Sequence, residues 1–148
     1  MASLKSLKKN TAAINDGQWV SVTLDDGDTI RVRSRGVTDA YRNAQSRQQQ
    51  NAAKGFGGDV AKLPVELKRA INCRVLAEHA FLDLAGLDDD GRAVTAEEVK
   101  DILRDRQQVV EYASLVDALF TAQAMVDEGL GEDRRDAEGN SAPYSGTL

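Results

Sequence analysis

The residue types best suited to acid–base chemistry are His79 and Asp83, which lie four positions apart. On a helix this spacing puts two side chains on one face, where a carboxylate could orient the imidazole. Such a pair predicts a small enzyme only if a nucleophile or a substrate pocket lies beside it. Cys73 is a poor partner, because it falls about 120° away from His79 around the same helix. We therefore expect a solvent-facing or interface histidine and no enzymatic activity.

Three arginines form the clearest charged pattern, because Arg31, Arg33 and Arg35 alternate along one predicted strand. Alternation places them on one face of that strand, and Trp19 comes from the strand before it. One interpretation is a docking surface for an acidic protein partner. The other is an exposed sheet face whose charges discourage edge-to-edge aggregation, and the sequence leaves both open. The partner-binding candidates are Trp19, Arg31, Arg33 and Arg35.

Two loops resemble ligand sites without meeting their requirements. The run Asp88-Asp89-Asp90-Gly91 is similar to a calcium loop, but Gly86 stands where the first carboxylate ligand must be. The run Gly55-Phe56-Gly57-Gly58 lacks the Lys-Ser/Thr ending of a phosphate-binding loop. We expect an acidic turn and a flexible loop, and we predict no metal and no cofactor.

The composition excludes several classes of protein. The 148 residues include 24 acidic and 19 basic side chains, so the net charge is −5 and nucleic acid is a poor partner. The single cysteine cannot form an internal disulfide, and no apolar run reaches about 18 residues, the length of a membrane span. The charge is uneven, with +4 on residues 1–54, −5 on 55–126 and −4 on 127–148. A basic N-terminal part beside an acidic body could pair within one chain or between copies.

Periodicity predicts a β-hairpin followed by helices. Apolar residues alternate on both sides of Asp25-Asp26-Gly27-Asp28, a turn in which Gly27 can take a positive φ. Thr95 and Glu98 form a capping box at the start of one helix. We predict an α+β fold in which hairpin 18–35 packs on a bundle of three to four helices, at about 38–50, 64–85, 96–104 and 107–128. The expected domain is 17–128, with a flexible segment 1–16 before it and a disordered tail 129–148 after it.

The order of these elements resembles a known family. The hairpin Trp19–Arg35 with its DDGD turn is followed by Gly36-Val37-Thr38-Asp39-Ala40-Tyr41. Further on, Phe81–Val99 combines a helix end, an acidic glycine turn and a helix that starts at a threonine. Together these segments make residues 17–127 similar to the tail assembly chaperones of long-tailed, siphovirus-like phages and prophages.

This resemblance implies a non-enzymatic protein of virion assembly in the cytoplasm of the bacterial host. Members of the family are thought to coat the tape-measure protein and to recruit tail-tube subunits, and some form homo-oligomers. A longer frameshifted product shares the N-terminal domain in that family. The implied partner is a protein, with no membrane. Two alternatives stay open: a structural virion protein, such as a tail-completion or connector subunit, and a small enzyme that uses His79 and Asp83.

Overall fold

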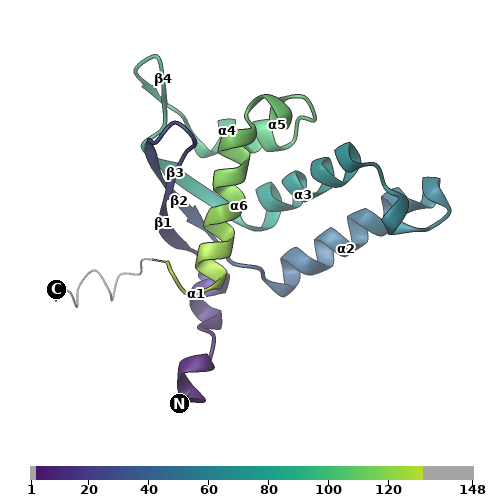
Figure 1. The fold of residues 1–148 in the computed structure, drawn as a ribbon, viewed down its shortest axis with the longest axis horizontal. Coiled ribbons are helices and arrows are strands. Elements are labelled where there is room, and N and C mark those ends of the chain that lie inside the picture. Colours follow the sequence, from purple (N-terminus) through teal and green to yellow (C-terminus); the bar gives the residue numbers. More distant parts are fainter. Residues whose placement is uncertain (1–2, 132–148) are drawn as a thin grey trace.

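The protein folds as an α+β domain in which a small antiparallel sheet is covered on one face by helices (Figure 1). The structure, a computed structural model, describes residues 3–131. In chain order its elements are η1 (Lys5–Leu7), α1 (Thr11–Asp16), β1 (Gln18–Thr23), β2 (Thr29–Ser34), α2 (Asp39–Ala53), η2 (Lys54–Phe56), η3 (Val60–Lys62), α3 (Val65–His79), β3 (Phe81–Ala85), β4 (Asp88–Asp89), β5 (Arg92–Ala93), α4 (Ala96–Leu103), α5 (Gln108–Glu111) and α6 (Ala113–Asp127). The main sheet has the order β1-β2-β3. The predicted fold class is confirmed.

Strands β1 and β2 form the predicted hairpin. Val20 pairs with Val32 and Trp19 pairs with Arg33, so apolar and polar side chains alternate between the two faces. Val20 and Val32 are almost fully buried under the helices. In the turn, Gly27 has a φ of 93°, the positive value that its position was expected to require.

The third strand corrects the sequence analysis. The helix expected over 64–85 ends at His79, and Phe81–Ala85 instead form β3, antiparallel to β2. Phe81 is buried in the core, whereas Asp83 is exposed on the opposite face of the sheet. A five-residue segment with four apolar residues is too short to show a decisive period. Pairing with this segment satisfies the backbone groups at the edge of β2, which a longer α3 would leave unpaired, and this tertiary contact decides its structure.

Helix α6 lies at the centre of the core, where it packs on β1 and β2. Its buried side chains are Leu115, Val116, Ala118, Leu119, Ala122, Gln123 and Val126. The single helix expected over 107–128 is interrupted, because Tyr112 with φ −106° and ψ 38° separates α5 from α6. The short α5 contacts α4, and its Val109 is buried.

Helices α2 and α3 form an antiparallel arm that projects away from the sheet (Figure 1). Only three of the fifteen residues of α2 are buried, namely Tyr41, Ala44 and Ala53. Polar side chains join the two helices, as where Gln45 Nε2 donates to Asn72 Oδ1 at 2.9 Å. Helix α2 therefore rests on a thinner apolar contact than α6 does, whereas α3 buries six side chains in the core.

Helix α4 begins at the predicted capping box. The Glu98 N–H donates to Thr95 Oγ1 at 3.2 Å, and the Glu98 carboxylate accepts from the Thr95 N–H. Just before it, the acidic turn forms a two-stranded hairpin, β4–β5. Its two central residues, Asp90 and Gly91, have φ of 51° and 81°, as a tight type I′ turn requires.

The ordered chain begins earlier than expected. Residues 1–16 were predicted to be flexible, yet α1 forms within them and its Ile14 is buried. The Asn10 side chain caps α1 by accepting from the Ala13 N–H at 3.1 Å. At the other end, Leu130 N donates to Met125 O at 2.8 Å and ends α6. The rest of the predicted tail, 132–148, lies outside the described residues.

Candidate partner-binding site

The sheet presents a face opposite the helices, here called the outer sheet face. Its members alternate with the buried residues of β1 and β2, and in β3 they follow an irregularity in the pairing after Phe81. They are Trp19, Ser21, Thr23, Thr29, Arg31, Arg33, Asp83 and Ala85. All except Trp19 and Arg33 are exposed, and those two are half-buried. The alternation that predicted a common face for Arg31 and Arg33 is thus matched by the structure, and the register of the strands adds Trp19 to that face.

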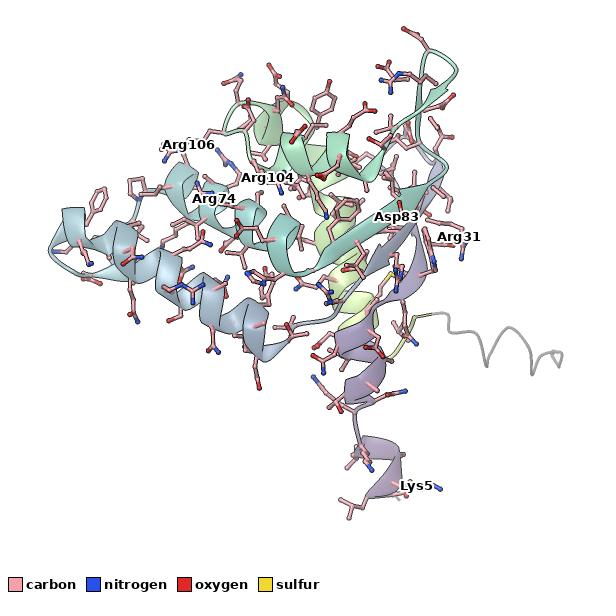
Figure 2. All side chains as sticks on the ribbon, turned by 180° about the vertical axis from the view of Figure 1, so that it is seen from behind. Lys5, Arg31, Arg74, Asp83, Arg104 and Arg106 are labelled. Atoms are coloured by element: carbon pink, nitrogen blue, oxygen red, sulfur yellow. The ribbon has the colours of Figure 1, made fainter. Side chains whose placement is uncertain are left out.

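Trp19 and Arg31 form the central contact of the outer sheet face. The Arg31 guanidinium lies over the indole ring, 5.0 Å from its centroid, which is cation–π geometry. This contact orders a flat aromatic surface next to a positive charge. Figure 2 shows Arg31 on the same side of the sheet as Asp83, which comes from β3. Aromatic and arginine side chains are enriched in protein–protein interfaces.

Arg33 and Arg35 hydrogen-bond to the backbone of α1, a structural role that the sequence did not predict. Arg33 Nη2 donates to Asp16 O at 3.2 Å, and Arg35 Nε donates to Asn15 O at 2.9 Å. These carbonyls belong to the last turn of α1, where the backbone lacks helical donors and the helix dipole favours a cation. The two guanidinium groups therefore attach α1 to the sheet, and Arg31 is the candidate arginine that stays fully on the outer sheet face.

The proposed His79–Asp83 pair loses its geometric basis. His79 is the last residue of α3, whereas Asp83 belongs to β3 and points to the outer sheet face. The two residues therefore do not share a helix face. The Asp83 carboxylate instead accepts from the Leu84 backbone N–H at 2.8 Å.

A second surface feature, here called the acidic pocket, lies at the end of the molecule that carries β4. It is a cavity of about 260 Å³ between the β1–β2 turn, the β4–β5 hairpin, α4 and the start of α6. Its apolar lining consists of Leu24, Leu87, Val94, Ile102, Tyr112 and Leu115, and its acidic lining of Asp88, Asp89 and Glu98. Ligand pockets for small molecules are usually larger. The size suits individual side chains of another protein.

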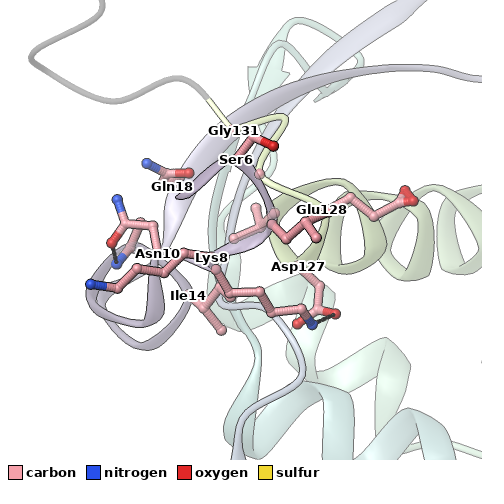
Figure 3. A pocket seen from close by; sticks show the side chains of 13 residues that line it. Ser6, Lys8, Asn10, Ile14, Gln18, Asp127, Glu128 and Gly131 are labelled. Atoms are coloured by element: carbon pink, nitrogen blue, oxygen red, sulfur yellow. Dashed lines mark hydrogen bonds and ion pairs between the residues drawn. The ribbon is translucent and has the colours of Figure 1, made fainter. Parts of the chain in front are cut away.

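A third hollow lies between the N-terminal residues and the end of α6 (Figure 3). Three of the polar side chains that line it, those of Lys9, Asn10 and Asp127, have partners within the fold. Lys9 Nζ lies 3.2 Å from Asp127 Oδ2, and Val37 N donates to Asp127 Oδ1 at 3.0 Å. The Asn10 side chain caps α1 from the same wall. Because these polar groups are already paired, this hollow is a structural joint between segments distant in sequence.

The single cysteine belongs to the core. Cys73 is 1% exposed, and burial raises the pKa of its thiol to about 11. A thiol with this pKa is protonated at neutral pH, which makes it a weak nucleophile and a weak metal ligand. Within residues 3–131, no three His, Cys, Asp or Glu side chains are placed to hold a metal ion. In this part of the chain, no helix combines the length and the apolar character needed to cross a membrane.

Sequence reasoning missed the acidic pocket, although one signal for it was present. The dipeptide Asp90-Gly91 is a preferred type I′ turn and predicts a tight hairpin at the acidic run. The other walls come from segments about 90 residues apart, such as Leu24 and Leu115, so no local pattern brings them together. The joint at Asp127 was missed for the same reason.

Comparisons of the chain with protein-family models, with curated proteins and with solved structures found no match. The functional conclusion therefore depends on the order of the elements and on the outer sheet face.

Proposed function

We propose that the protein is a phage tail assembly chaperone, which binds the tape-measure protein and helps to recruit tail-tube subunits in the cytoplasm of the bacterial host. The observation that carries the proposal is the outer sheet face, where Trp19 and Arg31 present an ordered aromatic and cationic surface. The hairpin, the Gly36–Tyr41 segment that leads into α2, the acidic glycine turn and the capped α4 support the family resemblance. The helix end expected at Phe81 does not, because Phe81–Ala85 form a strand. This surface binds and performs no covalent chemistry.

The proposed binding surface is tested by co-expressing the full chain with the tape-measure protein encoded by the same phage or prophage. We expect a complex in size-exclusion chromatography with light scattering. The double variant W19A/R31E should lose it, because aromatic and arginine side chains dominate the energetics of protein interfaces. The matched control is R47E, a charge reversal on the exposed side of α2. If the wild-type chain forms no complex, the proposed function is wrong. If W19A/R31E binds as tightly as R47E, the proposed surface is wrong.

Mass spectrometry of purified particles separates this function from that of a structural virion subunit. A chaperone acts during assembly and should be absent from finished tails. A tail-completion or connector subunit stays in them at a fixed copy number. Finding the chain at such a stoichiometry would overturn the chaperone proposal.

A further inference from the structure

The acidic pocket has a complementary surface elsewhere in the same chain, here called the N-terminal segment, residues 3–8. Leu4 and Leu7 are 88% and 69% exposed. They are three positions apart at η1, and Lys5 and Lys8 repeat that spacing one residue later. Side chains at i and i+3 eclipse one another in a 3-10 helix. The N-terminal segment therefore presents an apolar ridge beside a basic ridge.

The acidic pocket offers the opposite charge around an apolar floor. The two stretches that flank it, residues 25–28 and 88–98, carry eight acidic side chains and one basic side chain, Arg92. Arg92 is already engaged, because its guanidinium donates to both carboxylate oxygens of Glu98 at 2.7 and 3.1 Å. These two stretches, here called the rim of the acidic pocket, thus keep an excess of negative charge. A segment with leucines and lysines matches this combination of floor and rim.

One chain cannot fill its own acidic pocket. Lys9 pairs with Asp127 at the C-terminal end of α6, whereas Tyr112 and Leu115 line the pocket at the opposite end of that helix. The fifteen residues of α6 span about 22 Å. Both leucines would have to reach the pocket, but Leu7 lies only two residues before Lys9 and extends at most about 7 Å from it. Figures 1 and 2 accordingly place the N-terminal segment and the β4–β5 hairpin at opposite ends of the molecule.

We propose that the N-terminal segment of one copy binds in the acidic pocket of the next copy, so that chains associate head to tail. The two leucines cover the apolar floor, and the two lysines face Asp88 and Asp89. A contact between two different surfaces repeats on every copy and gives a filament or a closed ring. This assembly does not rest on the proposed chaperone function, because it is measured on the chain alone. A monomeric chain that still bound a tape-measure protein would overturn the assembly and leave the chaperone function intact.

The assembly is tested by analytical ultracentrifugation of the purified full chain over a range of concentrations, at low and high salt. The wild type should form species larger than a dimer, and salt should weaken them because the rim contacts are exposed. The variant L4D/L7D removes the apolar ridge and should weaken association about a hundredfold. The variant D88K/D89K reverses the rim and should also be monomeric. All four side chains are exposed, so neither variant changes the core.

A mixture of the two monomeric variants decides whether the contact is head to tail. L4D/L7D keeps an intact acidic pocket, and D88K/D89K keeps an intact N-terminal segment. Together they should form one-to-one heterodimers and nothing larger, because one competent contact remains. The control V65D places the same charge on an equally exposed apolar residue of α3 and should assemble like the wild type. The proposal is overturned by a monomeric wild type, by assembly of L4D/L7D, by loss of assembly in V65D or by a mixture that stays monomeric.

Discussion

At the scale of single residues, Gly36 is the point where three segments distant in sequence meet. Its N–H donates to Ile14 O at 3.0 Å, and its carbonyl accepts from Gln123 Nε2 at 3.4 Å. The neighbouring Val37 N–H is held by the Asp127 carboxylate. The linker from β2 to α2 is thereby bonded to both α1 and α6. Glycine is required here for space, since a Cβ would lie 2.8 Å from Ile14 Cγ2.

The substitution G36A should therefore destabilise the fold by about 1–3 kcal/mol, the usual effect of overpacking. Two neighbours would have to move, because the added Cβ also lies 3.0 Å from the backbone Cα of Asp127. Urea denaturation measures the change. The matched control is G55A, where a Cβ meets nothing within 4 Å and the free energy of unfolding should change by less than about 0.5 kcal/mol. Equal effects of the two substitutions would contradict this role of Gly36.

Cys73 should resist alkylation in the native protein. Burial raises the pKa of its thiol to about 11, so that at about pH 8 roughly one molecule in a thousand carries the thiolate. Iodoacetamide labelling followed by mass spectrometry should show slow modification that becomes rapid in denaturant. Fast modification under native conditions would show that the core around Cys73 opens far more often than its 1% exposure indicates.

At the scale of elements, the start of α4 couples a helix cap to the acidic hairpin. The Thr95 hydroxyl and the Glu98 carboxylate complete the capping box, and the same carboxylate accepts from Arg92 of β5. The pKa of Glu98 is lowered, chiefly because the Arg92 side chain hydrogen-bonds to its ionised form. The Glu98 carboxylate thus fixes both the start of α4 and the orientation of the β4–β5 hairpin.

This coupling predicts a specific pH dependence. Because the pKa of Glu98 in the folded protein is below its ordinary value of 4.5, its contribution is present above about pH 4.5 and is lost as the pH falls through the folded-state value. Urea midpoints measured between about pH 6 and pH 3 should fall less steeply for E98Q than for the wild type. The control E97Q changes the neighbouring exposed carboxylate and should keep the wild-type slope. An unchanged slope in E98Q would show that the Arg92–Glu98 contact does not stabilise the fold.

The sequence predicted those elements whose signals are local. The alternation in β1 and β2, the Gly27 turn and the Thr95 capping box depend on neighbours within a few residues, and the structure contains all of them. Strand β3 was missed because its state is decided by pairing with β2, about 50 residues away in sequence. At the candidate site, alternation predicted the shared face of Arg31 and Arg33. It could not predict that two arginines are engaged by α1, because that depends on where α1 lies.

At the scale of the whole molecule, α6 and α2 differ in how they are stabilised. The side chains of α6 that face the sheet are almost completely buried, whereas α2 buries few side chains and is joined to α3 through amide and carboxylate groups. Local stability follows the amount of buried apolar contact. The molecule therefore combines a firm core, to which α3 belongs, with a more easily opened helix α2.

Hydrogen exchange measured by mass spectrometry should resolve this difference. Amides of α2 should exchange faster than those of α6, because α2 can open without unfolding the sheet. Peptides from β1 and β2 should show protection similar to that of α6, since they share its core. Equal protection of α2 and α6 would mean that α2 and the core unfold as one cooperative unit.

The ion pair between Lys9 and Asp127 brings two segments together that are separated by almost the whole described chain. Because the two ends of the folded part lie side by side, the order in which the elements follow one another is not essential to their packing. A circular permutant that joins residue 131 to residue 9 through a short glycine linker, and opens the chain between Gly57 and Gly58 at the tip of the arm, should keep the native near-ultraviolet circular dichroism. Such a chain lacks the N-terminal segment altogether. It would present the outer sheet face and the acidic pocket on an unchanged core, so binding to a partner and association between copies could be measured independently.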